Sequence, residues 1–427
     1  MLKRIIKLIL PPFAIRGYHF MLALLGAVFY FSPSRKIIVI GITGTNGKST
    51  VVELATKILE EAGYKVASLS SISFRIGEKE EPNLLKMTMP GRFQIQRFLR
   101  QAVNSGCKYA VLEVTSEGIK QYRHKFIDFN SAVFTNLSPE HIEAHGSFEK
   151  YREAKGKLFQ AAKKIHIINL DDENADYFLQ FPASKKYGYT IKNKEPAIEN
   201  RQKFFIILCP LFNSGPDGVN FEAQGTKFNL KLIGEFNISN ALAAICVGLT
   251  QNISLETCQK ALEKIEGIPG RMELVISDPF KVFVDYAFTP AALEKVYQGL
   301  TNNYKLKTNK LICVLGAAGG GRDKWKRSVL GEIAGKYCTE IIVTNEDPYD
   351  ENPLKIIEDV SSGAGGKAQK ILDRREAINY ALKNAKPGDS VIITGKGCEP
   401  WICVAGGKKI PWDDRRVVKE EFAKLNL

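Results

Sequence analysis

The stretch Gly41-Ile-Thr-Gly-Thr-Asn-Gly-Lys-Ser-Thr50 decides the fold of this chain. It follows the apolar run Lys36-Ile-Ile-Val-Ile-Gly41 and precedes a helical pattern over Val51–Gly63. A strand, a glycine-rich loop and a helix in this order form a cradle for nucleotide phosphates, because glycines let backbone N–H groups converge on phosphate oxygens. We predict that Lys48 reaches the terminal phosphates and that the Ser49 hydroxyl holds a magnesium ion.

Strand-like and helical patterns alternate along the rest of the chain, which predicts an α/β fold with parallel sheets covered by helices on both faces. The character changes near residues 185–235, where turn signals between short β-like runs predict antiparallel hairpins. A helix is expected from Asn237 to about Leu249, and Gly267-Ile-Pro-Gly-Arg271 has the composition of a hinge. The predicted strands are Ile37–Ile40, Tyr109–Glu113, Ser131–Thr135, Ile165–Leu170, Phe204–Leu208, Phe228–Ile233, Val282–Asp285, Leu311–Leu315, Glu340–Thr344 and Val391–Thr394.

Polar residues follow two of these strands, at the sheet edge where open parallel sheets bind ligands. Glu113 ends one strand and is a candidate carboxylate beside the magnesium ion. Glu140, His141 and His145 follow another strand, and these are two of only five histidines in the chain. This grouping favours a functional cluster over isolated surface histidines.

Composition describes an ordinary globular protein, with 44% hydrophobic and 25% charged residues among 427, long enough for two or three domains. The formal net charge of +14 suits polyanionic substrates such as nucleotides, or an anionic membrane face. No signature of a nucleic-acid-binding module is present, so we expect no nucleic-acid partner. The eight cysteines show no C-x-x-C pair, which predicts reduced thiols in a cytosol.

The N-terminal segment, residues 1–35, is basic and hydrophobic. Phe20–Phe31 is a run of twelve uncharged residues, too short to span a bilayer unaided. Two interpretations stay open. The segment is either a helix packed on the body or on a second subunit, or an interfacial anchor whose basic residues face anionic lipid.

Nine motifs in order resemble those of the Mur ligases, the ATP-dependent amino-acid ligases of peptidoglycan precursor synthesis. Within that family the chain looks most like the members that add a diamino acid to UDP-N-acetylmuramoyl-L-alanyl-D-glutamate. The resemblance covers residues 36–427. Its motifs are Thr43–Ser49, Glu113 with Ser116, Asn136–Gly146, Glu153-Ala-Lys155, Gly234–Asn240, Gly270–Glu273, Asp285–Pro290, Gly321–Lys324 and Gly395–Glu399.

The resemblance implies a fold, domains and a mechanism. A P-loop domain with a parallel sheet and a small antiparallel part would occupy residues 36–268, and a Rossmann-like ligase domain that binds the amino acid would occupy residues 269–427. Residues 1–35 would stand in place of the family's UDP-binding domain. An acceptor carboxylate would attack the γ-phosphate of ATP, and an amine would then displace phosphate from the acyl phosphate.

The resemblance also assigns residues to ATP and to two Mg²⁺ ions. Catalytic roles fall to Lys48, Glu113, His141 and Lys155, with Ser49, Glu113, His141 and a carbamate on Lys155 as metal ligands. The ATP-binding residues would be Gly44, Thr45, Asn46, Gly47, Lys48, Ser49, Asn237, Asn240, Arg271, Asp285 and Phe288.

The same resemblance places the acceptor and the amino acid, with departures. Thr88 would touch the muramoyl end, and Ser116, Arg322, Asp347, Tyr349, Gly395 and Glu399 would also bind substrate. The family's Asp-Asn-Pro-Arg, whose arginine grips diaminopimelate, reads Glu346-Asp-Pro-Tyr349 here. Tyrosine cannot form a bidentate ion pair, so lysine and diaminopimelate both stay open as the diamino acid.

Alternatives follow from the short N-terminus. The acceptor could be lipid-linked instead of a UDP-muropeptide, or the chain could be a folylpolyglutamate-synthase-like ligase. A non-catalytic nucleotide-binding scaffold at the membrane is a third interpretation. We predict a cytoplasmic enzyme that residues 1–35 could hold at the inner face of the membrane.

Overall fold

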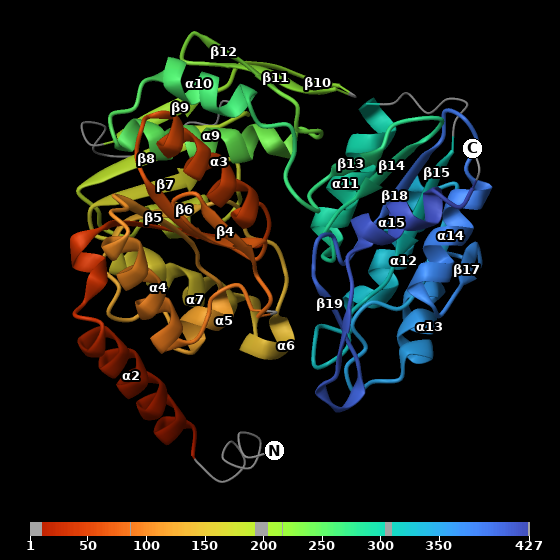
Figure 1. Cartoon of the computed structure of the whole chain (residues 1–427), viewed down its shortest axis with the longest axis horizontal. Helices are drawn as coiled ribbons and strands as arrows, with labels where there is room; N and C mark the ends of the chain where they lie inside the picture. The colour runs from red at the N-terminus through yellow and green to blue at the C-terminus, as the bar shows by residue number, and fades with distance from the viewer. Residues whose placement is uncertain (1–10, 86, 193–203, 216, 304–309, 426–427) are drawn as a thin grey trace.

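The computed structural model describes residues 11–85, 87–192, 204–215, 217–303 and 310–425. Two α/β lobes lie side by side, and helix α2 (Pro12–Phe29) projects from the first lobe (Figure 1). The chain passes once from the first lobe to the second, through the loop around Gly270. The prediction that residues 1–35, 36–268 and 269–427 form three separate domains stays a prediction.

The first lobe is built on a nine-stranded sheet in the order β4-β3-β2-β5-β1-β6-β7-β8-β9. Neighbours from β2 to β9 pair in parallel, and the β2-β3-β4 edge is antiparallel. The strands are β1 (Ile38–Thr43), β2 (Val66–Leu69), β3 (Ser73–Ile76), β4 (Lys79–Pro82), β5 (Tyr109–Glu113), β6 (Phe129–Phe134), β7 (Ile165–Asn169), β8 (Lys185–Thr190) and β9 (Phe204–Leu208).

Helices cover both faces of this sheet because its central strands are apolar on both sides. One face packs on α3 (Lys48–Glu61), α9 (Phe236–Thr250) and α10 (Leu255–Glu263). The other packs on α4 (Arg92–Asn104), α7 (Phe148–Ala161) and α8 (Ala175–Leu179). The short elements η1 (Pro33–Lys36), α5 (Ser116–Lys120) and α6 (Ile142–His145) complete the lobe.

The predicted hairpins are only partly right. A separate antiparallel sheet contains β10 (Leu211–Gly215), β11 (Gly218–Ala223) and β12 (Thr226–Leu230). The run Phe204–Leu208 does not belong to it, because β9 extends the main sheet in parallel to β8. A short, fully apolar run such as Phe204–Leu208 fits a hairpin strand and a strand of the main sheet equally well, so local sequence could not separate the two.

The second lobe has a six-stranded sheet in the order β13-β14-β18-β15-β16-β17, parallel except for β13. Its strands are β13 (Glu273–Ile276), β14 (Lys281–Val284), β15 (Leu311–Leu315), β16 (Glu340–Val343), β17 (Ala368–Lys370) and β18 (Ser390–Ile393). A separate hairpin contains β19 (Trp401–Cys403) and β20 (Lys409–Pro411), which η3 (Ala405–Gly407) joins. Helices α11 (Pro290–Asn303), α12 (Lys326–Tyr337) and α13 (Pro353–Gly363) pack on one face, and α14 (Arg374–Asn384) and α15 (Asp414–Phe422) pack on the other. The mixed α/β class predicted from the sequence is therefore confirmed.

The prediction that all cysteines are reduced is wrong for one pair. Cys313 on β15 and Cys338 at the end of α12 form a disulfide, with Cα atoms 6.1 Å apart. The other six cysteines are free. A separation of 25 residues carries no sequence signature, and only the packing of α12 on β15 brings the two sulfurs together.

Helix α2 packs on the first lobe along one side. Phe20 contacts the ring of Phe126 at 5.1 Å between centroids, and the Arg100 guanidinium donates to the Tyr30 carbonyl at 2.6 and 2.9 Å. In the described part of the chain, no helix is both long and apolar enough to cross a membrane.

Candidate active site

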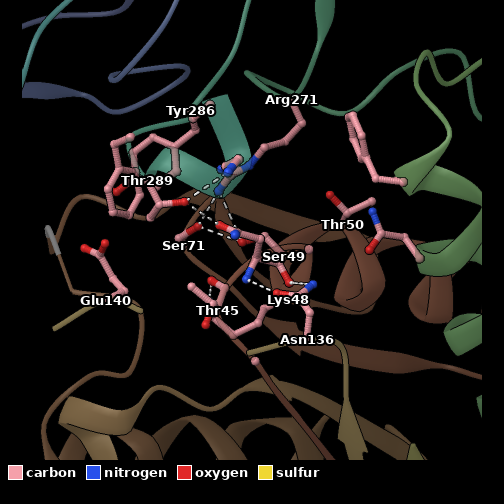
Figure 2. Close-up of a pocket in the computed structure, with 18 of the residues that line it drawn as sticks. Thr45, Lys48, Ser49, Thr50, Ser71, Asn136, Glu140, Arg271, Tyr286 and Thr289 are labelled. Carbon is pink, nitrogen blue, oxygen red and sulfur yellow. Dashed lines mark hydrogen bonds between the residues drawn. The ribbon is translucent and has the colours of Figure 1, made fainter. Parts of the chain in front are cut away.

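A cavity of about 980 Å³ lies between the two lobes, at the carboxyl ends of the parallel strands of both sheets. Figure 2 shows that Lys48, Ser49 and Asn136 approach it from the first lobe, and Arg271, Tyr286 and Thr289 approach it from the second. Ligands of open α/β sheets bind at this edge, because the loops that leave the strands converge there.

The glycine-rich loop between β1 and α3 is held open by neighbouring side chains. The Asn46 N–H donates to the Asn136 Oδ1 at 2.9 Å, and the Thr135 hydroxyl donates to the Asn46 carbonyl at 2.7 Å. A Cβ on Gly44 would lie 1.9 Å from the Thr135 Oγ1, and one on Gly47 would lie 2.3 Å from the Asn240 Oδ1. Gly47 also has φ +81°, so both positions require glycine.

Ser49 and Glu113 meet at the floor of the cavity. The Ser49 hydroxyl donates to the Glu113 Oε2 at 2.7 Å, and the Ser71 N–H donates to the same oxygen at 3.0 Å. The Lys48 Nζ donates to the Thr45 carbonyl at 2.8 Å and lies 3.7 Å from the Glu113 Oε1. Burial lowers the pKa of Lys48, and Glu113 opposes that shift. A hydroxyl and a carboxylate therefore adjoin a lysine next to the phosphate cradle.

Lys155 is buried, with 2% of its surface exposed, on the face of α7 that points into the lobe. Its Nζ donates to the Gly44 carbonyl at 2.6 Å. Burial, together with the charge of Lys48, lowers the pKa of Lys155 well below its usual value. A lowered pKa favours the uncharged form of the amine, and that form is the one that reacts with CO₂.

His141 lines the same cavity in the left-handed conformation, at φ +56°. Burial, then the charges of Lys155 and Arg322, lower its pKa to about 2. The imidazole is therefore neutral at any physiological pH and has a lone pair free to bind a metal. His145 lies farther out, 3.6 Å from the Glu117 carboxylate.

Arg271 reaches from the second lobe to the phosphate loop. Its Nη2 donates to the Ser71 Oγ at 3.0 Å and to the Ser49 Oγ at 3.3 Å. The Asp285 carboxylate accepts from the Met272 N–H at 2.7 Å and so fixes the turn that follows Arg271. The structure is thus in a closed arrangement, with a cation of the second lobe beside the hydroxyls of the first.

Asn237 and Asn240 lie on the first turns of α9. The Asn240 amide donates to the Asn237 Oδ1 at 3.0 Å, and the Asn237 amide donates to the Ile233 carbonyl at 2.9 Å. Both line the cavity, as does Phe288 on the opposite wall. The two amides are therefore positioned by each other behind the glycine loop.

A second contact between the lobes lies at α6 and is buried. The Lys326 Nζ is 2.7 Å from the Glu140 Oε1, with both side chains under 5% exposed. The Asp323 carboxylate accepts from the N–H groups of Ile142 at 3.3 Å and Glu143 at 2.9 Å. The loop before α12 therefore closes over the segment that carries His141.

We expect Lys326→Met to destabilise the closed protein strongly, because it leaves the Glu140 carboxylate buried without its counter-ion. Breaking a buried pair on one side costs about 3–5 kcal/mol, whereas Lys336→Met at the exposed Lys336–Glu294 pair is expected to cost below about 1 kcal/mol. Denaturant unfolding of both variants measures the change in the free energy of unfolding. The double variant Glu140→Gln/Lys326→Met removes the unpaired carboxylate as well and is measured beside them. An equal cost for Lys326→Met and Lys336→Met would contradict the prediction.

The wall of the second lobe carries an ionic cluster. The Lys396 Nζ lies 2.7 Å from the Glu399 Oε2 and 2.9 Å from the Asp347 Oδ1, and Tyr286 donates to the Glu399 Oε1 at 2.9 Å. Burial opposes the charge of Lys396, but Glu399 and Asp347 outweigh it and raise its pKa. Glu346 is buried beside them, and burial followed by Asp347 raises its pKa.

Most of the residues predicted from the sequence line the cavity, including Thr88, Ser116, Arg322, Asp347 and Glu399. Two predicted substrate ligands do not. Tyr349 packs over Gly320, and a Cβ added to Gly320 would lie 2.6 Å from the Tyr349 ring. Gly395 lies behind the Glu346 carboxylate, and a Cβ added to Gly395 would lie 2.4 Å from the Glu346 Oε2. Sequence reasoning assigned no role to Ser71, Tyr151, Lys326, Glu346 and Lys396. Ser71, Tyr151 and Lys326 lie outside the motifs, whereas Glu346 and Lys396 lie inside Glu346-Asp-Pro-Tyr349 and Gly395–Glu399, and only the tertiary fold shows their contacts.

The donor set fits a magnesium ion bound with nucleotide phosphates. Magnesium takes oxygen ligands, and protein sites typically supply one or two of them while phosphates and water supply the rest. Ser49 and Glu113 provide such oxygens beside the cradle. The described residues contain no cluster of three histidine, cysteine, aspartate or glutamate side chains that could hold a metal ion.

Comparisons with known proteins match both lobes. The Mur ligase middle domain matches residues 42–248, and the Mur ligase glutamate ligase domain matches residues 270–397. A UDP-N-acetylmuramoyl-L-alanyl-D-glutamate–2,6-diaminopimelate ligase of Caldanaerobacter subterraneus is 37% identical over 94% of this chain and 82% of its own length. A UDP-N-acetylmuramyl-tripeptide synthetase of Roseiflexus is 34% identical over 97% and 84%.

Solved structures agree on the architecture. A UDP-N-acetylmuramoyl-L-alanyl-D-glutamate–2,6-diaminopimelate ligase is similar with a TM-score of 0.60 and 29% identity, over 92% of this chain and 79% of the other. A folylpolyglutamate synthase of Mycobacterium tuberculosis has a TM-score of 0.69 at 16% identity, over 88% and 92%. The second likeness shows a shared fold alone.

Fold and site together define a two-lobed α/β enzyme that binds a nucleotide at a phosphate loop, of the class that couples ATP to bond formation. The chain belongs to the Mur ligase family. It is an ATP-dependent, magnesium-using ligase that forms an amide bond.

Proposed function

We propose that the chain joins a diamino acid to the D-glutamate of UDP-N-acetylmuramoyl-L-alanyl-D-glutamate. The observation that carries this proposal is the cavity itself, because a phosphate cradle forms one wall and an ionic cluster suited to a zwitterion forms the other. The substrates in the printed names of relatives 33–39% identical support the choice of acceptor.

In the first step the acceptor carboxylate attacks the γ-phosphate of ATP, and the barrier is the repulsion between two anions. Lys48 of the first lobe and Arg271 of the second supply positive charge beside the phosphate loop. Gly44–Ser49 present backbone N–H groups to the phosphates, and Asn237 and Asn240 lie where the nucleoside would extend. Thr88 and Ser116 also line the cavity and would contact the acceptor.

Ser49 and Glu113 would hold one Mg²⁺, and His141 with a carbamate on Lys155 would hold a second. Bound magnesium would neutralise phosphate charge and align the acceptor carboxylate with the γ-phosphate. The buried, low-pKa amine of Lys155 supports carbamate formation, because a carbamate replaces a cation with an anion next to a metal site.

In the second step an amine attacks the acyl phosphate and releases phosphate. The contacts of Arg271, Lys326 and Asp323 across the lobes support a closed state that keeps water from this intermediate. Arg322, Asp347 and Glu399 lie on the wall where the amino acid would bind.

Charge balance on that wall supports lysine rather than diaminopimelate as the amino acid. Three acidic groups, those of Glu346, Asp347 and Glu399, lie near the cations of Lys396 and Arg322. Arg374 also lies near Glu346, but its charge is paired with the Asp414 carboxylate at 2.7 Å. The Glu346 Oε2 is buried without a hydrogen-bond partner among the described residues. A surplus anion would complement a distal ammonium, but it would repel a distal carboxylate.

The test is phosphate release with ATP, Mg²⁺ and the UDP-muramoyl dipeptide, with lysine and diaminopimelate offered in turn. We expect lysine to be preferred by at least about tenfold in kcat/KM and the product to gain the mass of one lysine. Glu346→Gln should reduce this preference, whereas Glu358→Gln on the exposed face of α13 should not. Preference for diaminopimelate would overturn the choice of amino acid, and no release with either would overturn the proposed reaction.

A further inference from the structure

Helix α2 presents an uninterrupted apolar stripe to solvent. Tyr18, Met21, Leu25, Val28 and Phe29 are between 50% and 67% exposed. Their spacing of three and four residues places them on one side of the helix, and no charged residue occurs between Arg16 and Arg35. A folded domain rarely leaves such a stripe uncovered unless the stripe binds something.

The opposite side of α2 is already used for packing. Ala23 and Ala27 are buried, and a Cβ on Gly26 would lie 3.3 Å from the Arg92 carbonyl of α4. Small residues therefore bring α2 close to α4, and the helix is anchored along this side. The exposed stripe cannot turn inward without breaking that contact.

The surroundings of the stripe are basic. Residues 12–36 and α4 together contain Arg16, Arg35, Lys36, Arg92, Arg97 and Arg100 and no acidic residue. The exposed Asp128 lies beside Ser34, and Lys108 and Lys164 accompany it there. Arg16, Arg35, Lys36 and Arg97 are exposed. Phe31, 80% exposed, continues the apolar surface beyond the helix, and Phe93 of α4 lies 6.3 Å from Phe29 between ring centroids.

We propose that this surface, α2 with Phe31 and the arginines of α4, binds the surface of an anionic lipid bilayer. An apolar helix face flanked by cations is the pattern of a helix that lies in the interface plane, with its stripe among the acyl chains and its cations at the headgroups. Figure 1 shows α2 projecting below the first lobe. None of the described residues of α2 lines the cavity, so α2 can contact a bilayer without using a residue of the active site.

A second copy of this chain is the other candidate occupant, and the charge argues against it. Two identical surfaces that each carry six cations and no acid would repel each other across a dimer interface. An anionic bilayer supplies the opposite charge over the whole surface.

Vesicle co-sedimentation of the full chain tests the proposal without ATP or acceptor, so its failure is separate from failure of the proposed reaction. We expect binding to phosphatidylcholine vesicles containing about one-third phosphatidylglycerol, and at least about tenfold weaker binding to phosphatidylcholine alone. Met21→Glu/Leu25→Glu is expected to weaken binding by at least about thirtyfold. The matched control Leu211→Glu/Leu354→Glu adds the same charges at exposed sites on β10 and α13 and is expected to bind normally.

Equal binding to both vesicle types, or no binding to either, would overturn the proposal. Loss of binding in the control variant would do the same. Sedimentation equilibrium tests whether a second copy of the chain binds the surface instead. If the chain does not bind vesicles but forms a dimer that Met21→Glu/Leu25→Glu abolishes, the surface is a dimer interface. Thermal unfolding of each variant verifies that it is folded.

Discussion

Lys48→Met is expected to lower ATP-dependent phosphate release by at least about a thousandfold. The side chain sits at the phosphate loop, held by the Thr45 carbonyl at 2.8 Å and 3.7 Å from Glu113. Methionine preserves much of the volume but removes the charge that offsets repulsion between the γ-phosphate and the acceptor carboxylate. Steady-state phosphate release with the complete substrate mixture measures the effect.

Lys57→Met on the same helix is the matched control. Lys57 pairs with Glu60 at 3.0 Å on the surface of α3, and its replacement is expected to leave the rate within about twofold. Comparable losses in the two variants would mean that α3 as a whole is disturbed. A Lys48→Met enzyme with near-normal activity would contradict the assignment of Lys48.

Lys155→Arg is expected to abolish activity to a similar extent, although it retains a positive charge. Arginine cannot form the carbamate, so the proposed second metal ligand is lost and a cation stays near His141. Bicarbonate labelled with ¹³C should give the wild-type chain a carbamate resonance that Lys155→Arg lacks. Lys157→Arg, on the exposed side of α7, is expected to keep both resonance and activity.

The pH dependence of this carbamate follows from the lowered pKa of Lys155. Only the uncharged amine reacts with CO₂, so a depressed pKa allows the carbamate to form at lower pH than on an exposed lysine. As the pH falls through the pKa of the folded state, the amine protonates and the carbamate is lost. Activity in CO₂-depleted buffer should therefore decline toward acid and recover on adding bicarbonate. A fully active Lys155→Arg enzyme would exclude a carbamate role.

The phosphate loop and the central strands could be predicted locally. Gly41–Thr50 combines glycines, lysine and serine at fixed spacing after an apolar strand, and β5 and β15 coincide with the predicted Tyr109–Glu113 and Leu311–Leu315. These features depend on periodicity and turn chemistry within a few residues. The placement of β9 does not depend on such local features, because the choice between a hairpin and a sheet edge is made by strands far away in the chain.

Motif order along the chain also led to the family and to most of the cavity lining. Motif order could not predict the burial, contacts or orientation of those residues. Nothing in Glu153-Ala-Lys155 indicates that the lysine is buried against the Gly44 carbonyl, nor that Tyr349 turns away from the cavity while Glu346 faces it. The same holds for Cys313 and Cys338, which looked like two unrelated thiols.

Sequence alone determined the phosphate cradle, the α/β class and the ligase family, because each is written in short-range spacing or in motif order. Tertiary structure alone decided which polar and charged groups meet: Arg271 with the Ser49 hydroxyl, Lys326 with Glu140, and Lys396 between two carboxylates. It also decided that one side of α2 packs while the other stays exposed. Burial and pairing arise from contacts between residues distant in sequence, and such contacts set pKa values, closure and surface chemistry.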